Sequence, residues 1–208
     1  MFSEQTIPPR LLLILGGARS GKSTFAERLA TGSGKTVAFI ATAMDGDKEM
    51  HERIIRHKVS RPQEWCTIEE PLDLAGAAQQ AYQLADVAIL DCVTLWLGNM
   101  LLQAQEKNQS DDLKQAELQI SSDQFNEQAL QRIEELLAIL QNAEQGKTLI
   151  VVSNEVGLGI VPAYKLGRVY RDTLGYVNQR LAQDADRVYL MVAGMAVDIK
   201  RLHQEASL

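Results

Sequence analysis

Short apolar runs alternate with longer amphipathic stretches along this chain of 208 residues. The apolar runs have the length and β-branched content of buried strands, which predicts strands at Arg10–Leu15, Thr36–Thr42, Trp65–Ile68, Val87–Asp91 and Thr148–Ser153. The stretches between and after these runs predict helices at Lys22–Thr31, Asp45–Lys58, Leu72–Leu84, Thr94–Gln105, Phe125–Asn142 and, as one long helix, within Pro162–Ala185. Two last runs, Arg187–Val192 and Ala196–Lys200, flank Ala193-Gly194 and predict an antiparallel hairpin at a sheet edge.

This alternation predicts an α/β fold in which a mostly parallel sheet is covered by helices on both faces. The inward positions of the two longest helices follow from their spacing: Ala129, Ile133, Leu136, Leu137 and Leu140 in one, and Leu166, Val169, Tyr170, Leu174, Val177 and Leu181 in the other. No internal repeat divides the chain, so we expect one domain over residues 1–208, with a polar excursion at 106–124. Parallel sheets bind ligands at the edge formed by the carboxyl ends of their strands, which we call the rim. This rule places near the rim Gly16–Ser23, Thr42, Glu69, Asp91 and Asn154-Glu155.

Residues 16–23 read Gly-Gly-Ala-Arg-Ser-Gly-Lys-Ser, which fits the phosphate-binding pattern G-x-x-x-x-G-K-S. A predicted strand precedes this loop and a predicted helix follows it, as the motif requires. Backbone N–H groups of such a loop, together with the helix N-terminus, attract phosphate oxygens. We therefore expect Lys22 to contact the terminal phosphates of a nucleotide and the Ser23 hydroxyl to ligate Mg²⁺.

Asp91 ends an apolar strand, as does the Mg²⁺-supporting acid of P-loop enzymes. We favour a metal role for Asp91, because phosphate charge needs compensation; the alternative is an acid that merely ends a strand.

His57 lies in a charged predicted helix whose first half is acidic and whose second half is basic. The helix dipole alone explains this asymmetry, and a solvated charged face is the ordinary explanation for such a run. The basic half would also receive a triphosphate, and a neutral imidazole beside it is a competent nucleophile at phosphorus. Spacing alone favours the structural or solvated histidine.

Three further charged residues each allow more than one interpretation. Glu155, just past a strand in a glycine-containing loop, fits a catalytic base, a substrate contact or an ordinary loop acid. Arg168 and Arg171 on the long helix fit a phosphate clamp, or ion pairs with Asp172 or Asp184.

The net charge of −6 argues against a general nucleic-acid binder. Cys66 and Cys92 both sit in apolar runs, which predicts buried reduced thiols and a cytoplasmic location. The N-terminus does not have the pattern of a signal peptide, and no apolar run approaches the ~18 residues of a membrane span.

Several segments together resemble one family. They are residues 16–23, Ile40-Ala-Thr42, Arg53-Ile54 with His57-Lys58 and Arg61-Pro62, Val152–Pro162, Arg171-Asp172, Val177–Ala182 and Ala185-Asp186. In combination, from about Leu12 to Lys200, the chain resembles the bifunctional adenosylcobinamide kinase/adenosylcobinamide-phosphate guanylyltransferases of cobalamin biosynthesis.

The resemblance implies a RecA-like P-loop NTPase fold, a homotrimer, and the use of ATP or GTP with Mg²⁺. It implies phosphorylation of adenosylcobinamide, followed by transfer of GMP from GTP through a histidine–GMP intermediate to adenosylcobinamide phosphate. The family histidine corresponds to His57, and Lys22 is the other implied catalytic residue. The implied nucleotide contacts are Gly16, Gly17, Ala18, Arg19, Ser20, Gly21, Lys22, Ser23, Ala41, Thr42, Ala43, Lys58, Val59, Ser60, Arg61, Glu69 and Asp91, with Ser23 and Asp91 at the metal.

The chain departs from the family pattern at two positions. Some members have two adjacent histidines where this chain has Arg56-His57, and some relatives have glutamate at the position of Asp91. The nearest rival function is a P-loop small-molecule kinase with no covalent step. A GTP-binding switch is disfavoured because the chain has no Asn-Lys pair, and an ATPase motor because the chain is one predicted domain of acidic charge.

Overall fold

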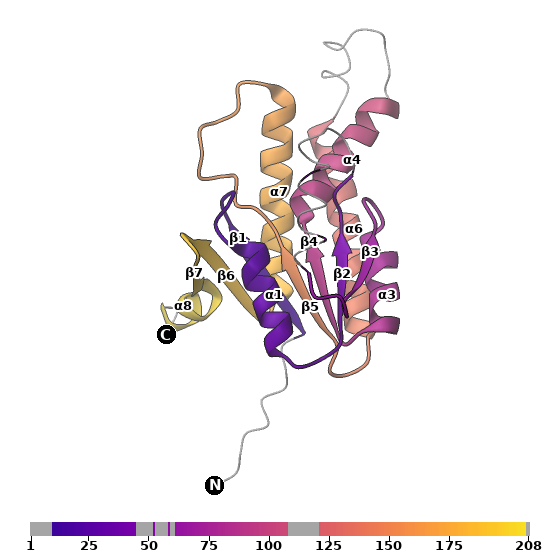
Figure 1. The fold of residues 1–208 in the computed structure, drawn as a ribbon. Helices are drawn as coiled ribbons and strands as arrows, with labels where there is room; N and C mark the ends of the chain where they lie inside the picture. Colours follow the sequence, from indigo (N-terminus) through magenta and orange to yellow (C-terminus); the bar gives the residue numbers. More distant parts are fainter. Residues whose placement is uncertain (1–9, 45–51, 53–57, 59–60, 108–120, 207–208) are drawn as a thin grey trace.

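The computed structural model describes residues 10–44, 52, 58, 61–107 and 121–206. Within these ranges, seven strands form one sheet in the order β3-β2-β4-β5-β1-β6-β7 (Figure 1). All neighbouring strands are parallel except β6 and β7, which form the predicted antiparallel hairpin. The strands are β1 (Leu11–Gly16), β2 (Val37–Ala41), β3 (Cys66–Glu69), β4 (Val87–Asp91), β5 (Thr148–Val152), β6 (Arg187–Val192) and β7 (Met195–Asp198).

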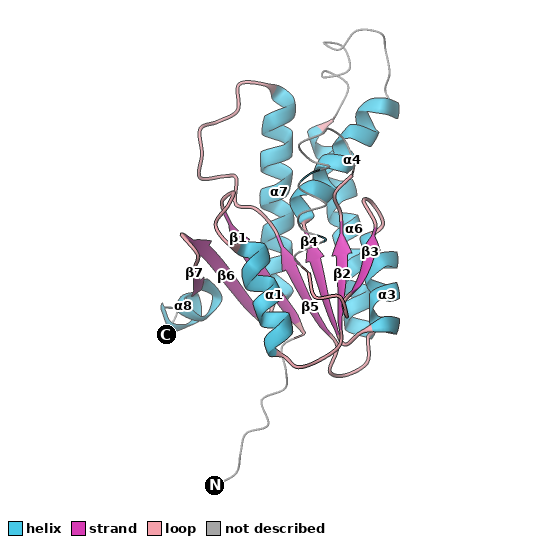
Figure 2. Ribbon diagram, in the orientation of Figure 1, coloured by secondary structure: helices cyan, strands magenta, loops and turns pink. Residues whose placement is uncertain are grey.

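Helices cover both faces of this sheet, which gives three layers (Figure 2). Helix α1 (Lys22–Gly32) packs on one face, where Phe25 and Ala26 meet Ile14 of β1. The other face carries α3 (Leu74–Leu84), α4 (Val93–Lys107), α6 (Ser122–Asn142), α7 (Lys165–Asp184) and α8 (Ile199–Ala206). Because successive strand residues point to opposite faces, Leu13 and Leu15 belong to this second, larger core.

The strand register brings the predicted rim residues to one level. Ala41 pairs with both Glu69 and Asp91, and Asp91 pairs with Val152. Strand β5 lies between β1 and β4, so the loop after β5 stands between the phosphate-loop strand and the strand that ends at Asp91.

The inward faces predicted for the two longest helices are confirmed. Every predicted inward residue of α6 is buried, and those of α7 are buried or packed against the core. Helix α3 begins at Leu74 rather than at the predicted Leu72, because the Asp73 carboxylate accepts a 3.0 Å hydrogen bond from the Gly76 N–H and caps the helix.

The predicted excursion at 106–124 is too long at both ends. Helix α4 extends to Lys107, and α6 begins at Ser122, where the Ser121 hydroxyl accepts from the Gln124 N–H at 3.4 Å. Residues 108–120 lie outside the described part of the chain. Of the predicted helix at 45–58, only Glu52 and Lys58 are described, and both are helical.

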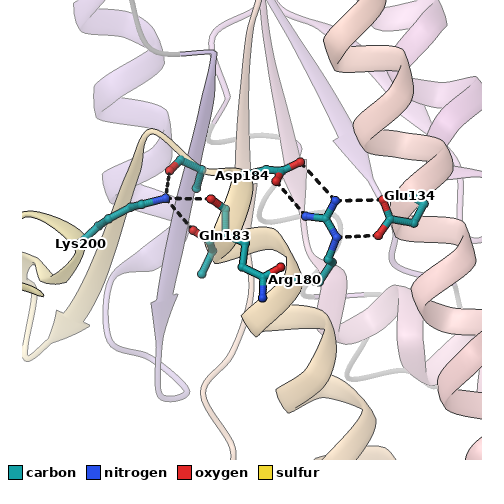
Figure 3. A network of polar contacts seen from close by, with 7 residues as sticks. Glu134, Arg180, Gln183, Asp184 and Lys200 are labelled. Carbon is teal, nitrogen blue, oxygen red and sulfur yellow. Dashed lines mark hydrogen bonds and ion pairs between the residues drawn. The ribbon is translucent and has the colours of Figure 1, made fainter. Parts of the chain in front are cut away.

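The predicted final strand, Ala196–Lys200, is wrong at its C-terminal end. Strand β7 stops at Asp198 because the Asp198 carboxylate accepts from the Arg201 N–H at 3.1 Å and starts α8. Lys200 therefore lies on a helix, and its ammonium donates to the carbonyl oxygens of Ala182 (2.8 Å), Gln183 (3.0 Å) and Ala185 at the end of α7 (Figure 3). A cation at this position also interacts favourably with the negative end of the helix dipole.

Arg180 connects α7 to α6 beside this cap. Its guanidinium donates to both carboxylate oxygens of Glu134, at 2.5 and 2.9 Å, and forms an ion pair with Asp184 on its own helix (Figure 3). A bidentate contact fixes the relative position of two side chains better than a single hydrogen bond, so this one holds the two long helices in register.

The predicted burial of both cysteines is half right. Cys66 is exposed, because β3 is an edge strand in which only Ile68 is buried. Cys92 follows β4, and the residue as a whole is partly buried. Its thiol is buried, which raises the pKa of the thiol to about 12. Within the described ranges, every helix is too short or too polar to traverse a bilayer.

Candidate active site

The phosphate-binding loop connects β1 to α1 as predicted. Its backbone uses positive φ at Gly16 (151°), Arg19 (58°) and Gly21 (94°), and Gly21 is the N-cap of α1. This conformation curls the loop around the Lys22 side chain, which is only 8% exposed and donates from Nζ to the Gly17 carbonyl oxygen at 2.6 Å. A buried lysine at a helix N-terminus is placed to bind an anion in the loop.

The turn of the β6–β7 hairpin packs against this loop. The Gly194 N–H donates to the Ser20 carbonyl oxygen at 3.1 Å, and a Cβ at Gly21 would stand 3.4 Å from the Gly194 Cα. The Ser20 hydroxyl is buried and has no partner among the described residues. The predicted edge hairpin is thus part of the wall of the phosphate site, which its sequence pattern did not indicate.

Thr42 lies at the rim as predicted, but its side chain is used in hydrogen bonds within the protein. The residue is fully buried. Its hydroxyl donates to the Cys92 carbonyl oxygen, and the hydroxyl oxygen of Thr42 accepts from the Cys92 N–H, both at 2.8 Å. The Asn99 amide donates to the Thr42 carbonyl oxygen at 2.8 Å. These bonds lock the end of β2 to the start of α4, so Thr42 positions the rim, where its neighbours Ala41 and Ala43 are half-buried.

Arg61 brings positive charge to the same rim. Its guanidinium lies 3.5 Å from the centre of the Phe39 ring, and Nε and one terminal nitrogen are buried without a hydrogen-bond partner among the described residues. Burial lowers the pKa of Arg61, while the nearby carboxylates of Asp91, Glu27 and Glu69 oppose that shift. Arginine remains charged under these conditions, so this cation is available to phosphate oxygens.

Glu27 is a rim residue that the sequence reasoning missed. It lies on α1 one helical turn after Ser23, and burial together with the negative charge of Asp91 raises the pKa of its carboxyl, against the opposing effect of Arg61. The available signal was its helical spacing from Ser23, which places both side chains on one side of α1.

Lys58 and Glu69 form an ion pair at the carboxyl end of β3. This contact brings one predicted basic residue to the rim beside Arg61. The other residues predicted from this segment, His57, Val59 and Ser60, lie outside the described residues.

The donor set fits a Mg²⁺ ion. Ser23 offers a hydroxyl on the first turn of α1, and Asp91 and Glu27 offer carboxylates that interact electrostatically with each other. Magnesium prefers such oxygen ligands and completes its shell with water and substrate phosphates. Among the described residues, no three His, Cys, Asp or Glu side chains form a metal cage.

The remaining predicted residues lie on the α7 side of the rim. The Glu155 N–H donates to the Gly16 carbonyl oxygen at 3.1 Å, and its carboxylate accepts from the Gly157 N–H at 2.7 Å. Arg171 forms an ion pair with Asp172, and Arg168 donates to the carbonyl oxygens of Pro162 and Ala163. In this structure both arginines are therefore engaged by the protein itself.

Comparison with known proteins decides between the possible P-loop families. A family model described as cobinamide kinase / cobinamide phosphate guanyltransferase (CobU) matches residues 12–199. The chain belongs to this family. The bifunctional adenosylcobalamin biosynthesis protein CobP of Pseudomonas aeruginosa is 43% identical over 188 residues, which are 90% of this chain and 96% of that protein. The bifunctional adenosylcobalamin biosynthesis protein CobU of Salmonella typhimurium is 39% identical over 192 residues, which are 91% and 99% of the two chains.

Membership of the CobU family confirms the family predicted from the sequence and the predicted enzyme class, a bifunctional kinase and guanylyltransferase. A solved structure of a prototypical ATPase from the type III secretion system of pathogenic bacteria has a TM-score of 0.50 and 11% identity over 95% of this chain. That match covers 54% of the ATPase, so this chain spans about half its length, and the likeness concerns the fold alone. With the observed sheet order, it confirms the predicted RecA-like P-loop NTPase fold.

Proposed function

We propose that this chain phosphorylates the hydroxyl of adenosylcobinamide with a nucleoside triphosphate and then transfers GMP from GTP to the new phosphate. The product is adenosyl-GDP-cobinamide, and the intermediate is a histidine–GMP adduct on His57. The observation that carries the proposal is the rim of a CobU-family chain, where Lys22 lies in the phosphate-binding loop and Arg61 interacts electrostatically with Asp91.

The described residues supply the means of neutralising phosphate charge. The phosphate loop carries backbone N–H groups and the Lys22 ammonium, and the Arg61 guanidinium lies over the Phe39 ring of β2, near the Asp91 carboxylate. Fixed donors in a partly buried site stabilise the charge that develops during phosphoryl transfer. Ser23 and Asp91 are the residues that would hold Mg²⁺, which when bound supplies further neutralisation of the phosphate oxygens.

The first reaction is a simple phosphoryl transfer. The oxygen of the cobinamide hydroxyl forms a bond to the γ-phosphorus, the bond from that phosphorus to the β–γ bridging oxygen breaks, and the hydroxyl proton is released. Lys22 holds the terminal phosphates in line for this displacement.

The second reaction needs a nucleophile for the α-phosphorus. A ring nitrogen of His57 forms a P–N bond while pyrophosphate leaves. An oxygen of adenosylcobinamide phosphate then attacks the same phosphorus, the P–N bond breaks, and the imidazole is restored. In support, Lys58, the next residue in the chain, is paired with Glu69 at the rim, beside Arg61.

Guanine-nucleotide contacts are proposed for the phosphate loop, for Ala41, Thr42 and Ala43, for residues 58–61, and for Glu69 and Asp91. Since Thr42 is fully buried, its proposed contact is restricted to positioning its neighbours. The same proposal includes the use of ATP or GTP in the kinase step, assembly as a homotrimer and a cytoplasmic location.

The test follows both products from adenosylcobinamide and Mg²⁺. Nucleotide labelled at the γ-phosphate should give labelled adenosylcobinamide phosphate, and GTP labelled at the α-phosphate should give labelled adenosyl-GDP-cobinamide. Lys22→Ala should abolish both products. Formation of the first product alone would overturn the guanylyl transfer and favour the simple kinase.

A further inference from the structure

An open cleft of about 650 Å³ lies between α7, β6, the start of α8 and the loop after β5. This volume falls in the ~300–1,000 Å³ range of small-molecule sites. The cleft lies on the face of the sheet opposite α1, because Leu15 and Val188, which line it, belong to the core on the α7 side. It is therefore distinct from the nucleotide-binding face of the rim.

The cleft nevertheless reaches the phosphate loop. Glu155 lines its upper end, and the Glu155 N–H donates to the carbonyl oxygen of Gly16, the first residue of the loop. Leu15, in the cleft wall, is the residue immediately before Gly16. A molecule seated in the cleft can thus extend one arm over the end of β1 to the terminal phosphate of a bound nucleotide.

The walls combine apolar and polar side chains. Leu15, Val188, Ala182 and Ile199 form an apolar floor, while Gln179 and Tyr176 bring polar groups from α7. Gln179 is exposed and its amide has no hydrogen-bond partner among the residues that the structure describes, and Tyr176 is 47% exposed.

Asn178 also lines the cleft but is already engaged by the fold. Its side-chain oxygen accepts from the Ser153 hydroxyl at 2.7 Å, and its nitrogen donates to the Asn154 carbonyl oxygen at 3.0 Å. Arg171 and Asp172 line the cleft as well and are paired with each other. Gln179 and Tyr176 are therefore the uncharged polar groups of α7 that a ligand can use.

An apolar lip continues the cleft along the loop that leads to α7. Gly157 lines the cleft, and the residues that follow it are exposed: Leu158 by 86%, Ile160 by 97%, Val161 by 62% and Tyr164 by 75%. A run of exposed apolar side chains beside a polar-walled cleft marks a ligand or partner surface.

From these observations we propose that the cleft binds the corrin macrocycle of the substrate, with its carboxamide arms on Gln179 and Tyr176 and its apolar surface on the floor and lip. The proposal rests on the proposed function. A flat macrocycle with methyl groups on its faces and amides at its edge needs apolar area and paired donors and acceptors, which is the lining found here. The arm that bears the reacting hydroxyl then points past Glu155 to the phosphate loop.

The test measures binding of dicyanocobinamide by equilibrium dialysis, without nucleotide, to wild type, Gln179→Trp and Gln179→Ala. The tryptophan should fill the cleft and weaken binding at least about tenfold, and the alanine should weaken it about threefold, as expected for one lost hydrogen bond. Gln128→Trp, on the exposed face of α6 outside the cleft, is the matched control and should bind as wild type. Circular dichroism verifies that each variant is folded.

Unchanged corrinoid binding in folded Gln179→Trp would overturn the cleft assignment. A change in molecular mass on Gln179→Trp with corrinoid binding unchanged would also overturn it, and would make the cleft an interface between copies of the chain. Failure of the proposed function is separate, because it would appear as wild type that binds corrinoid and forms neither labelled product.

Discussion

The backbone N–H of Gly194 donates a 3.1 Å hydrogen bond to the carbonyl oxygen of Ser20. This bond joins the turn of the C-terminal hairpin to the middle of the phosphate-binding loop, although the two segments lie at opposite ends of the chain. Since the turn residues Ala193 and Gly194 both have positive φ, the hairpin is tight and presents its backbone directly to the loop. The phosphate loop is therefore supported by the sheet edge as well as by its own strand and helix.

Gly16 is the loop position with least room for a side chain. A Cβ there would stand 2.6 Å from the Met191 carbonyl oxygen and 2.7 Å from the Ser20 hydroxyl oxygen, so Gly16→Ala should lower the free energy of unfolding by about 1–3 kcal/mol. Urea unfolding measures this change. Gly17→Ala is the matched control, because a Cβ at Gly17 meets nothing within 4 Å. Equal losses for the two variants would contradict the close packing of loop and hairpin.

Thr42 should matter for stability through its hydroxyl. Thr42→Val keeps the shape but leaves the part-buried N–H and C=O of Cys92 without this partner, which should cost about 1–3 kcal/mol in the free energy of unfolding. Thr42→Ser retains the hydroxyl and should recover most of that loss in the same denaturant titration. A valine variant as stable as the serine variant would refute the structural role.

The raised pKa of Glu27 predicts that the protein becomes less stable as pH rises. Because burial and Asp91 raise the pKa of Glu27, the folded state favours the protonated carboxyl, and the stability this contributes is lost as pH rises from the ordinary glutamate pKa of 4.5 through the folded pKa. Glu27→Gln should therefore be more stable than wild type at pH 7, by a small amount since the group is partly solvated. The difference should vanish when urea unfolding is repeated below pH 4.5. A constant difference at both pH values would show that the charge is not the cause.

The two cysteines should differ in reactivity. Cys66 is exposed, whereas burial raises the pKa of Cys92 to about 12 and keeps it a thiol. An aromatic disulfide reagent at pH 8 should label the native chain at Cys66, and Cys66→Ser should abolish that fast reaction. Cys92 should react only in denaturant. Rapid labelling of native Cys66→Ser would place the Cys92 thiol at the surface.

The elements with strong local signals were predictable. The loop at 16–23 follows from its motif, and the faces of α6 and α7 follow from apolar spacing, since burial of such a stripe is what stabilises the helix. The rim level of Glu69 and Asp91 follows from the rule that parallel strands end at one edge.

The features that sequence reasoning missed depend on contacts between distant segments. Asp198 continues the apparent strand pattern, yet its carboxylate caps α8, and Lys200 finds its partners on α7. The exposure of Cys66 depends on β3 being at the sheet edge, which strand order decides and the sequence of β3 does not reveal. The support of the phosphate loop by Gly194 has the same origin.

The central claim is the covalent histidine–GMP intermediate, and one labelling experiment tests it most directly. Wild type, His57→Ala and His51→Ala are incubated with Mg²⁺ and GTP labelled at the α-phosphate, without cobinamide, and protein-bound label is measured. His51→Ala is the matched control, because it removes another of the chain's three histidines from the same segment.

The account predicts label that is acid-labile and alkali-stable on wild type and on His51→Ala, and none on His57→Ala. Label that persists on His57→Ala, or a folded wild type that binds GTP and takes up no label, would contradict it.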